Sequence, residues 1–172
     1  MGQIRPRKWL AIRQPGYGEL SPAERRAAAD FSLVWGLFEL RAMESMGREG
    51  TFNISCIRHL VDNGHVGIES VHNLRGRFQY FQARYYPDGQ PSAHFPMLRF
   101  QPGPDADFVA HTLAAPLPSD ADTLKASLII VYRYRNNLFH GNKWLYDLHD
   151  QHDNFHHATA LLMDTYDALV LP

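Results

Sequence analysis

Apolar residues recur at spacings of three and four along several stretches of this sequence, and this period restricts its fold more than any other feature. Residues at these spacings share one face of an α-helix. Over 21–46, the apolar face consists of Phe31, Val34, Trp35, Phe38 and Ala42. Ser21 can cap this helix, Pro22 suits its first position, and Glu24 can reach back to the cap. The pattern therefore predicts a long helix over 21–46.

The same period predicts four further helices. A short helix is expected over 51–63 and a longer one over 68–85, where Pro87 stops it. A third major helix should run over 119–140, and a last one over 153–169. Helices joined by short turns favour an antiparallel bundle. We therefore expect an all-α fold, an antiparallel bundle of four to five helices in a single domain spanning 1–172.

The stretch 87–119 differs from the rest of the chain in composition. It holds seven of the eleven prolines, namely Pro87, Pro91, Pro96, Pro102, Pro104, Pro116 and Pro118. A long regular helix cannot pass through so many prolines. A loop of this length is often functional. Within it, Met97–Phe100 could pair as a short strand, and Asp105–Ala114 could form one or two helical turns.

Composition and charge restrict the class of protein. The formal net charge is −1 with histidines neutral, so a nucleic-acid site must be a local basic patch. The basic arm 1–20 is broken by Pro6 and Pro15 and lacks the apolar run of a signal peptide. No apolar stretch approaches the ~20 residues of a membrane span. The single cysteine, Cys56, excludes an internal disulfide, so we expect a cytoplasmic protein.

One arginine interrupts the apolar face of the helix expected over 119–140. That face consists of Leu124, Leu128, Val131 and Leu138, and Arg135 falls on the same seam. A buried arginine is costly unless it pairs with an anion or is hydrogen-bonded. It would face a carboxylate or an anionic ligand in a cleft. Arg135 is therefore the first candidate for a functional residue.

His140 lies five positions after Arg135. Five residues of an ideal helix turn through about 500°, so the two side chains would point about 140° apart. They can converge only if the last turn is irregular or if the pair is completed across an interface. Gly141 directly after His140 fits an irregular ending.

The segment Arg135-Asn136-Asn137-Leu138-Phe139-His140 resembles the R-x4-H signature of the HEPN superfamily, in which an Asn commonly follows the Arg. Three flanking segments are also similar to HEPN sequences: Tyr132-Arg133-Tyr134, Gly141-Asn142-Lys143 and the helical stretch Phe31–Glu39. The resemblance implies a metal-independent endoribonuclease without a cofactor, built as a homodimer in which the motif helices meet at a two-fold axis. It also implies a toxin or defence effector, with an antitoxin protein as partner.

The resemblance assigns roles to the motif residues. Arg135, His140 and Asn136 would be catalytic. The residues expected to contact RNA are Arg133, Lys143 and Asn137. A second interpretation stays open, because many HEPN-like domains are non-catalytic: Arg135 would then dock a protein or nucleotide partner without cutting RNA. The role of 87–119 is equally open, since it could cover the cleft, extend the dimer interface or bind the antitoxin.

Other polar groups compete with the motif for a functional role. His152 and His156 lie four apart on an expected helix, a spacing that suits a metal, but a metal site needs three or four convergent ligands. Glu39 could pair with Arg135 or Arg41, or lie at the surface. Two further groups could contact RNA or simply be solvated or packed: the basic side chains Arg75, Arg77 and Arg84, and the aromatic side chains Tyr80, Phe81, Tyr85 and Tyr86.

Overall fold

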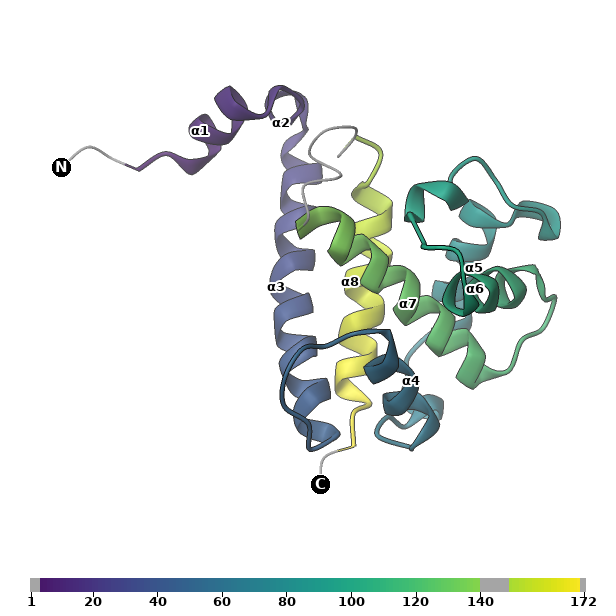
Figure 1. Cartoon of the computed structure of the whole chain (residues 1–172). Coiled ribbons are helices and arrows are strands. Elements are labelled where there is room, and N and C mark those ends of the chain that lie inside the picture. Colours follow the sequence, from purple (N-terminus) through teal and green to yellow (C-terminus); the bar gives the residue numbers. More distant parts are fainter. Residues whose placement is uncertain (1–3, 140–148, 171–172) are drawn as a thin grey trace.

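A computed structural model describes residues 4–139 and 149–170, and this part of the chain is helical without a β-strand (Figure 1). Two short helices lead in, α1 (Pro6–Arg13) and α2 (Pro15–Glu19). The main helices are α3 (Pro22–Ser45), α4 (Ile54–Asp62), α5 (Leu74–Tyr85), α6 (Pro104–Ala114), α7 (Asp120–Phe139) and α8 (His152–Asp167). The prediction of an all-helical bundle is confirmed. None of these described helices has the length and apolar character needed to cross a bilayer.

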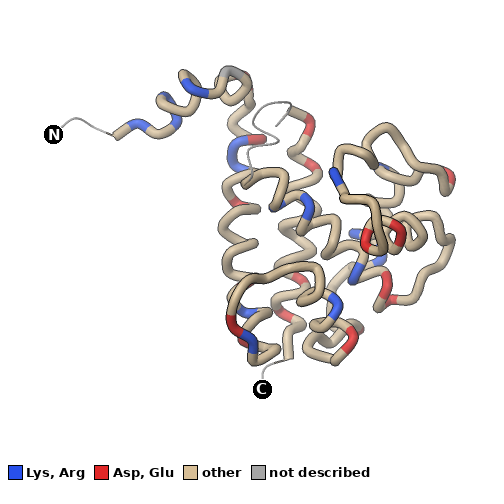
Figure 2. The backbone as a smooth tube through the Cα atoms, viewed as in Figure 1, with Lys and Arg blue, Asp and Glu red and all other residues tan. Residues whose placement is uncertain are grey.

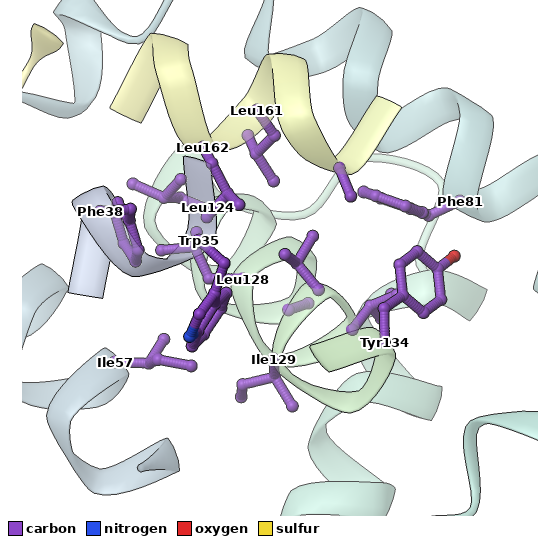
Figure 3. Packing of buried hydrophobic residues seen from close by; sticks show 14 of the residues in the cluster. Trp35, Phe38, Ile57, Phe81, Leu124, Leu128, Ile129, Tyr134, Leu161 and Leu162 are labelled. Carbon is purple, nitrogen blue, oxygen red and sulfur yellow. The ribbon is translucent and has the colours of Figure 1, made fainter. Parts of the chain in front are cut away.

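Helix α7 lies at the centre of the bundle. Its buried residues cover almost its whole circumference along the middle turns, from Leu124 to Val131. A helix that is apolar all round is stable only when other helices surround it. Figure 3 shows side chains of α3, α4, α5 and α8 converging on it, with Trp35, Ile57 and Phe81 among them. The motif of the sequence analysis therefore begins on the most enclosed helix of the described chain.

Helices α3 and α8 pack along each other. The capping box predicted for α3 is present, since Ser21 Oγ accepts from the Glu24 amide and Glu24 Oε2 accepts from the Ser21 amide. His149, just before α8, lies 3.8 Å from a Glu24 carboxylate oxygen, so the two helices begin side by side. They consequently run in the same direction, as Figure 1 also shows, and α7 crosses them obliquely in the opposite sense. The bundle is thus not antiparallel in every pair.

The region 68–85 is not one continuous helix. A 3-10 turn, η1 (Ile68–Ser70), is followed by α5 only from Leu74. Asn73 has φ of 49°, a left-handed conformation that breaks a right-handed helix and that asparagine tolerates better than most residues. Val71 is nevertheless buried. The apolar spacing in this region therefore predicted buried positions correctly, but the continuous helix that it also predicted is interrupted at Asn73.

The proline-rich stretch 87–119 folds against the bundle with helices of its own. It contains η2 (Pro87–Gly89), η3 (Phe95–Leu98) and α6. Met97 and Leu98 therefore lie in a 3-10 turn, not in the strand considered for Met97–Phe100. The helical turns considered over Asp105–Ala114 are confirmed as α6, which begins with Pro104 and carries two aspartates in its first turn.

A buried polar network joins α5, α7 and α8. The Tyr85 and Tyr134 hydroxyls are 2.7 Å apart, and Tyr134 also donates to Asn154 Oδ1 at 3.2 Å. Tyr80 donates to the same Asn154 oxygen at 2.7 Å. Burial raises the pKa of Tyr134 well above its ordinary value, raises that of Tyr85, and raises that of Tyr80 to about 12.

This network predicts a loss of stability in alkali. Tyr85 and Tyr134 ionise in the unfolded chain near pH 10 but stay neutral in the folded protein. Because their folded pKa values are raised, their contribution is complete below pH ~10 and is lost as the pH rises further. Each should lower the free energy of unfolding by about 1.4 kcal/mol per pH unit there. Urea unfolding from pH 9 to 12 measures this slope. Tyr134→Phe should make this slope against pH shallower. An unchanged slope would contradict the assignment of the alkaline instability to Tyr134.

Candidate functional site

The side chain of Arg135 is half-buried on α7, one turn beyond the most enclosed part of the helix. Its Nη1 donates to Asn136 Oδ1 at 3.1 Å, and its guanidinium carbon lies 5.3 Å from the centre of the Phe139 ring. Its Nε is shielded from solvent and has no hydrogen-bond partner among the described residues. The guanidinium is therefore oriented by two neighbours, and its Nε is a buried donor without an acceptor in the described chain.

Arg135 shares its shielded, unpartnered Nε with Arg84, but it differs from several other arginines in lacking a carboxylate partner in the described chain. Those arginines pair with carboxylates, in Arg58–Asp105 at 2.7 Å, Arg77–Asp164 at 3.3 Å and Arg75–Asp120. No carboxylate in the described chain forms an ion pair with Arg135. Its predicted neighbours on the seam, Leu124, Leu128, Val131 and Leu138, are buried as expected. The fully buried position next to it is taken by Tyr134, which leaves Arg135 at the edge of the core.

Asn137 of the motif and Arg133, which lies two residues before the motif, bind the proline-rich stretch. Arg133 Nε donates to the Leu98 carbonyl at 3.0 Å, and its Nη2 donates to the Arg99 carbonyl. Asn137, which is 2% exposed, donates to the Met97 carbonyl at 3.2 Å. Desolvation lowers the pKa of Arg133. These polar groups, which the sequence analysis assigned to RNA contact, are therefore engaged with the backbone of η3.

Of the remaining motif residues, some lie within the described chain and others lie outside it. Asn136 is half-buried, and its Oδ1 accepts the hydrogen bond from Arg135. His140 and Lys143 lie outside the described residues, and so does Gly141. The structure thus places the arginine half of the R-x4-H motif at the last described turn of α7.

The competing candidates have other partners. Glu39 accepts from the Trp35 indole at 2.6 Å, and Arg41 pairs with Glu44 at 3.3 Å. The rings of His152 and His156 are parallel at 6.2 Å. Within 4–139 and 149–170, no group of three or more His, Cys, Asp or Glu side chains is placed to hold a metal ion.

The aromatic and basic groups considered for RNA contact are largely engaged in the fold. Phe81 and Tyr85 are buried in the core. Tyr80 stacks on His157 at 3.9 Å between ring centres, and burial lowers the pKa of this histidine. Arg84 interacts with the hydroxyls of Tyr80 and Tyr85. The Tyr80–His157 stack joins α5 to α8, and the contacts of Arg84 lie within α5.

The structure adds a feature that the sequence analysis missed, since the N-terminal arm lies beside the end of α7. A cavity of about 270 Å³ lies between Leu10 of α1, Ser32 of α3 and Phe139 of α7. An adjoining cavity of about 300 Å³ is lined by Arg7, Arg25 and Arg26. Figure 2 shows the basic positions along α1. Basic side chains therefore gather on this side of the motif, and Asp30 lines the second cavity together with them.

Comparisons with protein-family models, with curated proteins and with solved structures found no match to this chain. The resemblance to HEPN domains consequently rests on the motif residues themselves.

Proposed function

We propose that this protein is a metal-independent endoribonuclease of the HEPN type. The observation that carries the proposal is Arg135, a half-buried arginine without a carboxylate partner in the described chain, whose shielded Nε has no acceptor there. An arginine held in this way is suited to bind a phosphate, which accepts several parallel N–H bonds. The R-x4-H pattern supplies the histidine that phosphodiester chemistry needs.

The cleavage uses a nucleophile within the RNA. A base removes the proton of the 2′-hydroxyl, the 2′-oxygen attacks phosphorus, and the bond to the 5′-oxygen breaks as an acid protonates that oxygen. Two copies of His140, one from each protomer of a homodimer, would act as base and acid. Arg135 would stabilise the charge that develops on the phosphorane, and Asn136 would orient Arg135. The products carry a 2′,3′-cyclic phosphate and a 5′-hydroxyl.

The biological setting follows from the same proposal. An uncontrolled ribonuclease in the cytoplasm is toxic, so the protein would act as a toxin or defence effector restrained by an antitoxin protein. Lys143, together with the arginines around the cavity at Arg7 and Arg26, would contact the RNA backbone. Binding through phosphate contacts of this kind weakens as the salt concentration rises.

A non-catalytic interaction module is the second candidate. It is favoured by the contacts of Arg133 and Asn137, because both side chains hold the backbone of η3 and leave fewer polar groups for RNA. In that case Arg135 would bind an anionic group of a protein or nucleotide partner.

Cleavage of total RNA in EDTA by wild type and by His140→Ala separates the two candidates. Cleavage by wild type alone, with cyclic phosphate ends on the products, is the expected result. No cleavage by either protein, from a folded dimer, would favour the interaction module. Equal cleavage by both would place the activity outside this motif.

A further inference from the structure

One face of α3 is apolar and has no partner within the described chain. Leu33, Leu37 and Leu40 follow one another at spacings of four and three, and their side chains are 75%, 53% and 59% exposed. At these spacings they form one stripe along the helix, the pattern by which helices pair. The stripe lies opposite the buried face of Phe31, Trp35 and Phe38. Figure 1 shows α3 at the edge of the molecule, with α7 and α8 on its inner side.

Gly36 lies within this exposed stretch, at the middle of a 24-residue helix. Glycine in a helix interior destabilises the helix relative to alanine. Packing within the protomer does not require it, because a Cβ at this position would meet no atom within 4 Å. A small residue on an exposed helix face allows the backbone of another helix to approach closely. The backbone at Gly36 is therefore open to the close approach of a second helix.

The charges that flank the stripe identify its partner. Arg26 and Asp30 precede the leucines, and Arg41 and Glu44, which pair with each other at 3.3 Å within the helix, follow them. A two-fold axis beside Gly36 would place Asp30 against the partner's Arg41, and Arg26 against the partner's Glu44. The same axis sets Leu33 against the partner's Leu37 and the partner's Leu40. A parallel arrangement in register would instead oppose like charges.

We propose that this face of α3 binds a second copy of the chain, with the two α3 helices antiparallel about a two-fold axis beside Gly36. The surface is self-complementary in both its apolar and its charged residues, which an isologous dimer requires. The homodimer that the resemblance implies has the motif helices at its two-fold axis, whereas this surface places α3 there. The inference therefore stands on α3 alone and needs no RNA chemistry.

This arrangement also bears on the motif. Ala29 and Ser32 of α3 line the same cavity as Phe139, so the end of α7 faces the flank of α3 beside the stripe. A two-fold axis perpendicular to the plane of two antiparallel helices keeps each flank on the same side of the pair. The ends of both α7 helices would consequently lie on one side of the dimer.

Sedimentation equilibrium of the full chain without RNA tests the surface. The wild type should sediment at twice its mass of 19.7 kDa. Leu37→Glu should weaken the dimer about 100-fold, because it would place two carboxylates in the apolar contact. Leu117→Glu is the matched control, since Leu117 is an exposed leucine just before α7, and it should leave the dimer intact. A wild type that stays monomeric at about 100 µM would overturn the proposal. Equal dissociation by both variants would do the same.

Charge reversal tests the antiparallel register. Asp30→Arg alone and Arg41→Asp alone should each weaken the dimer about tenfold, because each sets like charges against one another. The double variant should regain most of the wild-type affinity, since the pair is then reversed and not removed. A double variant no tighter than either single variant would overturn this register. RNA is absent from both experiments, so their failure and a failure of the ribonuclease proposal are seen separately.

Discussion

Arg135→Ala should lower the rate of RNA cleavage by about 100- to 1,000-fold, the usual effect of removing one group that stabilises a developing anion. The loss should fall on kcat more than on KM, because the phosphorane carries more charge than the bound phosphodiester. Arg135→Lys should recover only part of the activity, since lysine keeps the charge but lacks the planar set of donors. Single-turnover cleavage of one labelled RNA measures all three proteins.

The matched control for this prediction is Arg48→Ala. Arg48 is an exposed arginine just after α3, at the end of that helix far from the last described turn of α7. Its replacement removes the same charge and should leave cleavage unchanged. All variants should unfold as cooperatively as the wild type, because Arg135 has no ion pair with a described carboxylate. Full activity of Arg135→Ala, or an equal loss in Arg48→Ala, would remove the assigned role.

Phe155→Ala should lower the free energy of unfolding by about 3–5 kcal/mol, the largest stability effect that we expect from a single substitution here. Phe155 is buried on α8, 5.1 Å from Phe31 of α3 and 6.5 Å from Tyr134 of α7, measured between ring centres. Its removal leaves a cavity where three helices meet, and neighbouring side chains can refill it only in part. Domains are stable by only about 5–15 kcal/mol, so the variant should be marginal.

Urea unfolding measures this effect, with Met163→Ala as the matched control on the same helix. Met163 is exposed, so its truncation creates no cavity and should change the free energy of unfolding by less than about 0.5 kcal/mol. Similar effects of the two substitutions would contradict the packing of α8 described above. A near-wild-type Phe155→Ala protein would contradict it as well.

Local sequence patterns were sufficient for the helices whose signals lie within a few residues. The capping box at Ser21 and Glu24 predicted the start of α3, because both hydrogen bonds join residues three apart. The apolar period of 119–140 predicted a helix, and α7 is described from Asp120 to Phe139. The break at Asn73 was missed, because the apolar period continues through Val71 although the helix does not.

In the motif too, the sequence predicted some features, and others depend on contacts between distant residues. Its sequence singled out Arg135 as an anomaly on an apolar seam, and the side chain is half-buried without a carboxylate partner in the described chain. The neighbouring polar residues could not be sorted from the sequence. Arg133 and Asn137 bind carbonyls 34 to 40 residues earlier in the chain, and no local pattern encodes contacts over that separation.

The sequence by itself determined where most helices form and which positions are apolar, since both depend on spacing, capping and proline within a few residues. The tertiary structure alone decided that α3 and α8 run in the same direction, that 87–119 folds onto α7, and that the basic arm lies beside the end of α7. These features depend on which surfaces meet once the helices pack. For the exposed leucines of α3, the sequence determines their spacing, but only the packed structure shows that they remain exposed.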